Sequence, residues 1–242
     1  MNQNEQTTPS GVLLVDKAQN MTSHDAVAIA RRSLGIKKIG HCGTLDPMAT
    51  GLLMLVVGKA TKIQDLLMSE DKEYEGTLTM GATTSTQDAQ GDILEEKPFN
   101  EVTEEQVRAA FSEFTGNFEQ IPPMVSAIKK DGVPLYKLAR KGQEVVRDPR
   151  PVYVNNYELS RIEIPEVDFV VQCSKGFYVR TYAHDIGARL GCGAHLSALR
   201  RTRSGKFTLE RAITVDQLKN APREELLASM VSLAEISLMR GA

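Results

Sequence analysis

The sequence contains no tryptophan and few aromatic residues, which make up 5% of its 242 positions. A surface that stacks on nucleic-acid bases would therefore depend on a small number of tyrosine, phenylalanine or histidine side chains. Cysteine is also scarce, with three widely spaced residues. An odd number of distant cysteines does not predict a disulfide framework, so we expect the protein to work in a reducing compartment, the cytoplasm.

Long hydrophobic runs are missing as well. No apolar segment approaches the roughly 20 residues of a membrane-spanning helix, and the polar N-terminus lacks the basic-then-apolar pattern of a signal peptide. We expect residues 1–10 to be a disordered leader and residues 11–242 to form one mixed α+β domain. The sequence thus predicts no binding to membranes.

The net charge of −2 conceals two basic segments. From Lys129 to Arg150, seven basic residues accompany three acidic ones, and from Arg200 to Lys206 there are four basic residues and no acid. A solvated face explains any single run of charge. Two such runs on an otherwise acidic chain favour binding to the phosphate groups of a nucleic acid.

Hydrophobic periodicity and turn residues predict alternating strands and helices. Thr103 and Gln106 have the spacing of a capping box at the start of one helix. The segment 121–151 contains Pro-Pro and Asp-Gly turns and most of the first basic run, and we expect it to be a projecting flap. Strands are expected over 11–17, 52–57, 72–81, 152–164 and 167–174, and helices over 22–35, 59–69, 104–114 and 176–191, with residues 83–92 as a polar loop.

The segment GHCGTLDPMATGLL, residues 40–53, places Asp46 in a glycine-rich loop ahead of a buried strand. Asp-Pro favours a turn, and a turn residue is the default interpretation of such a pair. A rigid strand beside an accessible loop also suits a carboxylate that reacts with a ligand. From the residues alone, both interpretations of Asp46 stay open.

Two further kinds of site are disfavoured. His41, Cys42, Cys192 and His195 are possible zinc ligands, but adjacent residues rarely converge on one ion, so we expect no metal. The segment VVGKAT lacks the first glycine of a phosphate-binding loop, which excludes a nucleoside triphosphatase of that type. Taken alone, Arg180 is typical of a surface arginine, and Tyr74 fits either a core aromatic or a stacking platform.

The segment GHCGTLDPMATGLL closely resembles the catalytic motif of the bacterial TruB family, tRNA pseudouridine synthases that modify the T-loop uridine at position 55. The same family is matched by Lys17 with MTSHD, by DKEYEG, by CSKGFYVRTYAHDIGARLGCGAH and by LRRTRSGKF. The segment IPPMVSAIKKDGVPLYKLARKG resembles its RNA-gripping insertion. Ala18 and Asn20 depart from the family pattern Lys-Pro-x-Gly, which predicts a changed turn with activity retained.

The resemblance implies the α+β pseudouridine synthase fold, a bent and mainly antiparallel mixed sheet flanked by helices, with a catalytic cleft. It implies that Asp46 is the nucleophile, that Arg180 pairs with it and that Tyr74 stacks on a flipped uracil. His41 would fill the space that the base leaves. The remaining substrate-binding residues are expected to be Tyr178, Leu199, Lys17, Lys129, Lys130, Arg200 and Arg201.

The implied reaction is a redox-neutral isomerisation, so we expect neither a cofactor nor a metal. The expected partner is the T-arm stem-loop of tRNA, bound by a monomer. Because the chain ends at Ala242, we expect no C-terminal PUA domain. A non-catalytic module that binds or folds tRNA is the alternative function.

Overall fold

The computed structural model describes residues 8–130 and 132–241. Within the predicted leader, residues 1–7 lie outside the described residues, and the amide of Lys59 donates to the hydroxyl of Ser10 at 2.9 Å. The chain divides into two compact units, one formed by the residues up to Glu70 and from Arg200 onward, the other by Asp71–Leu199. Among the described residues, no helix has the length and hydrophobicity needed to cross a membrane.

The first unit is built on the antiparallel pair β1 (Gly11–Lys17) and β3 (Thr50–Val57). Both strands are almost wholly buried, as the apolar sequence of residues 52–57 predicts. Strand β2 (Ile39–Cys42) pairs antiparallel with β3, and Arg200 and Arg201 of β12 (Ala194–Ser204) pair with β3 in parallel. The unit also contains η1 (Gly58–Ile63), α2 (Gln64–Met68), β13 (Phe207–Thr208), η2 (Leu209–Arg211), β14 (Ile213–Thr214), α6 (Val215–Asn220), α7 (Arg223–Ala228), β15 (Val231–Ser232) and α8 (Leu233–Met239).

Helix α1 (Ser23–Leu34) of this unit follows its sequence signals closely. Thr22 and Asp25 form a capping box at its start, and Gly35 adopts a left-handed conformation at its end. The predicted helix 59–69 begins instead as the 3₁₀ turn η1, and only Gln64–Met68 are α-helical. The local pattern therefore identifies a helical segment but not its type.

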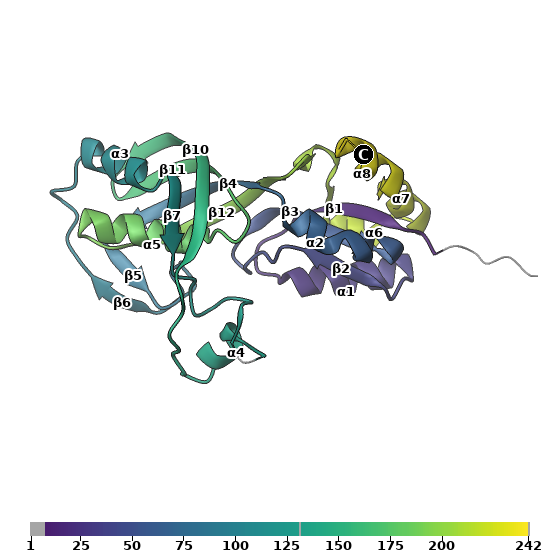
Figure 1. The fold of residues 1–242 in the computed structure, drawn as a ribbon, viewed down its shortest axis with the longest axis horizontal. Coiled ribbons are helices and arrows are strands. Elements are labelled where there is room, and N and C mark those ends of the chain that lie inside the picture. Colours follow the sequence, from purple (N-terminus) through teal and green to yellow (C-terminus); the bar gives the residue numbers. More distant parts are fainter. Residues whose placement is uncertain (1–7, 131, 242) are drawn as a thin grey trace, which may run out of the picture. The chain divides into compact units, whose positions relative to one another are not determined.

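In the second unit the strand order is β12, β4, β11, β10, β7, and the pairs β4–β11, β11–β10 and β10–β7 are antiparallel (Figure 1). Its helices include α3 (Glu104–Glu113), which begins with the predicted Thr103–Gln106 capping box, and α5 (Val179–Leu190). The prediction of an α+β fold with a mixed, mainly antiparallel sheet is confirmed. The other elements of this unit are β4 (Lys72–Met80), β5 (Ala82–Thr84), β6 (Ile93–Glu96), β7 (Gly116–Gln120), β8 (Lys129–Lys130), β9 (Val133–Pro134), α4 (Leu135–Ala139), β10 (Arg150–Glu163) and β11 (Glu166–Cys173).

One face of this sheet packs against α3 and α5 through aromatic side chains. Tyr182 is fully buried, and its ring lies 5.6 Å from that of Phe111 and 5.8 Å from that of Phe169. A Cβ atom at Gly76 would lie 2.7 Å from the Phe169 ring, so glycine at this position of β4 leaves room for the aromatic packing. Strand β4 is thereby held directly under the helices.

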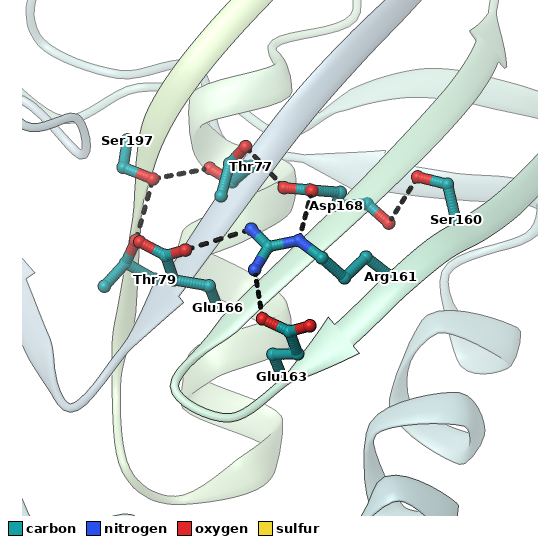
Figure 2. A network of polar contacts seen from close by, with 8 residues as sticks. All are labelled: Thr77, Thr79, Ser160, Arg161, Glu163, Glu166, Asp168 and Ser197. Atoms are coloured by element: carbon teal, nitrogen blue, oxygen red, sulfur yellow. Dashed lines mark hydrogen bonds and ion pairs between the residues drawn. The ribbon is translucent and has the colours of Figure 1, made fainter.

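The opposite face carries a polar network centred on Arg161 (Figure 2). The guanidinium of Arg161 pairs with Asp168 at 2.7 Å, and Asp168 accepts a hydrogen bond from Thr77 of β4 at 2.7 Å. Glu163 and Glu166 also pair with Arg161, and the hydrogen bonds that Arg161 donates to these three acids raise its pKa. The network fixes β10, β11 and β4 in register on the side opposite to the aromatic cluster.

Residues 121–130 and 132–149, within the segment expected to be a flap, extend away from the sheet of the second unit (Figure 1). The flap has internal order, because Leu135 is buried, Lys130 donates to the carbonyl of Val146 and Arg147 donates to that of Pro122. Lys129 and Lys130 themselves are exposed. The flap thus presents its basic side chains from a folded segment.

Candidate active site

Asp46 lies in the loop of residues 43–49, which connects β2 to β3 in the first unit. The backbone carbonyl of Asp46 accepts a hydrogen bond from the Ala49 amide at 3.0 Å, so the Asp-Pro pair does form a turn. At the end of the loop, Gly51 has φ +96°, and a Cβ atom there would lie 2.2 Å from the backbone oxygen of Arg201. This glycine allows β3 and β12 to come together beside the turn.

The start of α1 holds the middle of this loop. The Ser23 hydroxyl donates to the Leu45 carbonyl at 3.2 Å and accepts from the Leu45 amide at 2.9 Å. The backbone amide and carbonyl of Leu45 are therefore both hydrogen-bonded to the buried side chain of Ser23. The hydrogen bonds that a regular strand would supply are replaced here by a hydroxyl from another element.

Lys17, at the end of β1, holds the turn itself. Its side chain is 0% exposed, and its ammonium donates to the carbonyls of Ala18 at 2.9 Å, Met21 at 2.8 Å and Pro47 at 3.4 Å. The Pro47 carbonyl also accepts from the Asn20 amide at 2.8 Å. Lys17 thus connects the residues before α1 to the turn that contains Asp46.

Asn20 occupies the position where the sequence departs from the family's glycine. Its φ is +61°, in the left-handed region that glycine adopts most easily and that asparagine tolerates better than most residues. The amide of Asn20 still reaches Pro47. Asparagine therefore fits this left-handed turn without a glycine.

Two cations are buried around the turn. Burial and the charge of Arg201 lower the pKa of Lys17, whereas the Asp46 carboxylate raises it, giving a pKa of about 8. Arg201 is 1% exposed and donates to the carbonyls of Leu52 at 2.7 Å and Gly43 at 3.3 Å. Its guanidinium, which the sequence assigns to substrate binding, supports both ends of the Asp46 loop.

Arg200, the neighbour of Arg201 on β12, points to a different partner. Its guanidinium pairs with the Asp16 carboxylate through contacts of 2.7 Å and 3.0 Å. Side chains of successive strand residues point to opposite faces, so two adjacent arginines have separate environments. The second basic run is therefore partly structural, because two of its arginines are bonded to neighbouring parts of the sheet.

His41 stands on β2, directly before the loop. Burial, with smaller contributions from His24 and Arg201, lowers the pKa of His41 to about 4, so its imidazole is neutral at physiological pH. Its Nδ1 atom is buried, and no described residue forms a hydrogen bond with it. Within the first unit, the structure thus gathers Asp46, Lys17, Arg201 and His41 around one loop.

Arg180 belongs to the second unit, in the first turn of α5. It is 4% exposed, and it donates to the carbonyls of Thr86 and Val125, each at 2.8 Å. Its Nε atom also lies 3.7 Å from the carboxylate of Asp88. Arg180 is therefore a buried and fixed cation, unlike the surface arginine that the sequence pattern alone suggests.

Asp88, which the sequence places in a polar loop, is a buried part of this arrangement. Its carboxylate accepts from the Thr86 hydroxyl at 2.6 Å and from the Gln90 amide at 3.0 Å. The loop is tied to β12 because the Leu196 amide donates to Gln87 and the Ala89 amide donates to Leu196. An aspartate bonded to the amide two residues on is a turn pattern that the sequence could have revealed.

The remaining predicted residues of the second unit lie on separate elements. Tyr74 is on β4, on the same face as the buried Gly76 and Leu78, and is partly buried. Tyr178 precedes α5, and its amide donates to the buried side chain of Gln120 at 3.0 Å. Leu199 is buried on β12.

The possible zinc ligands have other contacts. Cys42 donates to the Gln64 carbonyl at 3.8 Å, and His195 lies 3.1 Å from the carbonyl of Ala82. Across the described ranges 8–130 and 132–241, no three histidine, cysteine or acidic residues form a group that could hold a metal ion.

Comparison with known proteins shows to which family the chain belongs. Residues 31–179 match the model of the TruB family pseudouridylate synthase N-terminal domain, and residues 180–238 match that of the tRNA pseudouridylate synthase B C-terminal domain. The chain belongs to the TruB family. It is 57% identical to tRNA pseudouridine synthase B of Opitutus terrae over 89% of this chain and 90% of that protein. For the protein of the same name from Syntrophotalea carbinolica, the identity is 47% over 93% of this chain and 74% of the relative.

Solved structures agree with this assignment. A crystal structure of a Cbf5-Nop10-Gar1 complex matches with a TM-score of 0.73 and 31% identity, over 97% of this chain and 64% of that chain. An H/ACA RNP bound to a substrate RNA containing 2′-deoxyuridine matches with a TM-score of 0.65 and 30% identity, over 88% and 53%. The TruB protein described here is therefore an RNA-binding isomerase of the pseudouridine synthase fold, which converts uridine to pseudouridine in tRNA.

The contact between Asp88 and Arg180 generates a first prediction. Asp88→Asn keeps the shape of the side chain but removes one anionic contact of the buried Arg180 guanidinium, which costs roughly 1–3 kcal/mol. We expect a lower free energy of unfolding in urea and at least a tenfold slower formation of pseudouridine. Asp92→Asn, in the same loop, is the control. Equal effects of the two substitutions would contradict a specific role of Asp88.

Proposed function

We propose that this TruB enzyme isomerises the T-loop uridine at position 55 of tRNA, with Asp46 as the nucleophile. The observation that carries the proposal is the fixed turn of Asp46, which a buried ammonium, a buried guanidinium and the Ser23 hydroxyl support from three elements. A loop that only connects β2 to β3 has no need of two buried cations. A carboxylate that must react in a defined orientation does require such support from buried cations.

The proposed chemistry exchanges one bond of the ribose for another. The C1′–N1 glycosidic bond breaks, the uracil turns within the site, and C1′ becomes bonded to C5. The proton at C5 leaves and N1 gains a proton, so the product is an isomer of the substrate. A carboxylate can form an adduct during this exchange or remove a proton next to the anomeric carbon. Redox chemistry is not involved, and we propose that neither cofactor nor metal takes part.

Arg180 and Tyr74 are the proposed partners of this carboxylate. Covering an aspartate with a bound base removes its hydration, and a guanidinium offsets that cost. The two carbonyls and Asp88 around Arg180 support this role, because they fix the cation before substrate arrives. We assign to Tyr74 stacking on the uracil and transfer of the C5 proton.

The target uridine is stacked in a folded RNA loop and must be turned outward, at a cost of roughly a few kcal/mol. We propose that the neutral imidazole of His41 fills the space that the base leaves, and that Tyr178 and Leu199 line the pocket that receives it. A neutral ring suits this task because an uncharged imidazole loses little hydration between stacked bases.

The cations fall into two groups in this proposal. Lys129 and Lys130 on the flap and the guanidinium of Arg200 bind phosphates of the T-arm. Lys17 and Arg201 act on the substrate through the loop that holds Asp46, because both are buried. We further propose that the enzyme acts as a monomer in the cytoplasm.

The assigned nucleophile is tested with an unmodified T-arm stem-loop in the presence of EDTA. Because Asp46→Asn removes the nucleophile, we expect at least about a thousandfold slower pseudouridine formation, with RNA affinity within threefold of wild type. Asp65→Asn, an exposed aspartate on α2, is the matched control and should retain activity. An RNA with cytidine at the T-loop position should give no product. Activity of Asp46→Asn, or modification of another uridine, would contradict the proposal.

The proposed flap contacts are tested by the salt dependence of RNA binding. Lys129→Ala combined with Lys130→Ala should lower the slope of log affinity against log salt by about one to two, because up to two phosphate contacts disappear. Lys37→Ala with Lys38→Ala removes the same charge from an exposed loop of the first unit and is the control. An identical slope change in both double variants would show a general charge effect and exclude phosphate binding by the flap.

A further inference from the structure

The side chains at the start of α1 have separate contacts. Thr22 and Asp25 cap the helix, and Ser23 holds Leu45. His24 lies between them, and its side chain is exposed. Neither the capping of the helix nor the bonding of the loop uses this imidazole.

His24 contacts His41 ring to ring. The two centroids are 5.2 Å apart and the ring planes are inclined by 83°, an edge-to-face arrangement. Aromatic rings prefer this geometry, which places the positive edge of one ring against the electron-rich face of the other. The contact joins the second residue of α1 to strand β2, which precedes the Asp46 loop.

Within the described residues, no hydrogen bond at Nδ1 fixes the orientation of the His41 ring. That atom is buried, and within the described part of the chain it has no bonding partner. The charged or titratable groups that influence His41 are His24 on α1 and Arg201 on β12. Arg201 donates to backbone carbonyls, whereas the ring of His24 packs directly against the ring of His41 and can set its angle.

We propose that His24 is a positioning residue for His41: its ring holds the neighbouring imidazole at the angle needed to enter the space left by the flipped uridine. This inference rests on the role proposed for His41 and adds the residue that prepares it. The ring of His24, rather than its charge, carries the effect. His24 therefore acts on the step that follows RNA binding.

The experiment compares His24→Ala, which removes the ring, with His24→Phe, which keeps a ring of similar width. For His24→Ala we expect a three- to tenfold slower single-turnover rate, the loss expected from about one edge-to-face contact, with KM within twofold of wild type. His24→Phe should restore the rate to within twofold. Arg32→Ala, an exposed residue on the same helix, should leave the rate unchanged.

A second measurement follows the protonation of the His41 imidazole directly. The proton resonances of His41 should titrate near pH 4 in the wild type and at a higher pH in His24→Ala, because that substitution removes both a covering ring and a neighbouring charge. Equal rates for His24→Ala and wild type would overturn the inference, as would a His24→Phe enzyme as slow as His24→Ala, a loss confined to KM, or an unchanged titration of His41. An inactive wild type would instead contradict the proposed function.

Discussion

The hydrogen bonds of the Lys17 ammonium are the constraint on which the Asp46 loop depends. The loop lies between two strands and has no ladder of its own, and the cation closes it by binding the Pro47 carbonyl together with two carbonyls ahead of α1. Burying an ammonium is costly, which is why burial is the main cause of its lowered pKa. The carbonyls and the nearby Asp46 carboxylate offset that cost, and the result is a carboxylate on a turn of defined position.

The groups that we propose for the reaction come from both stretches of the chain, and each unit holds its own in a similar way. In the first unit, Asp46 lies on a loop fixed by α1, Lys17 and Arg201, and His41 lies on β2 before it; Tyr74 and Arg180 belong to the second unit. In the second unit the logic is the same, because a buried cation is held by backbone carbonyls and one aspartate. Each unit therefore fixes its local structure through buried cations that donate to backbone carbonyls, and such contacts are strong where water is excluded.

The fold was largely predictable because its signals are local. The box formed by Thr22 and Asp25, the glycine at position 35 and the apolar residues 52–57 each specify a helix end or a buried strand. The site was predictable only in part. Charge in the sequence marks Arg200 and Arg201 equally, yet one pairs with Asp16 and the other supports the loop, since their environments depend on strands distant in sequence. Asp88 was missed for the same reason: its partner Arg180 lies ninety-two residues further along the chain.

The most direct test of the role of Lys17 is the single-turnover rate of a folded Lys17→Met enzyme on unmodified tRNA. Methionine fills a similar volume but binds no carbonyl, so the turn is released while the core stays packed. We predict at least a tenfold slower rate with a tRNA dissociation constant within threefold of wild type, and no such loss for Lys59→Met, an exposed lysine of the same unit. A Lys17→Met enzyme that remains folded and reacts at the wild-type rate would contradict the claim that this buried cation holds Asp46 in place.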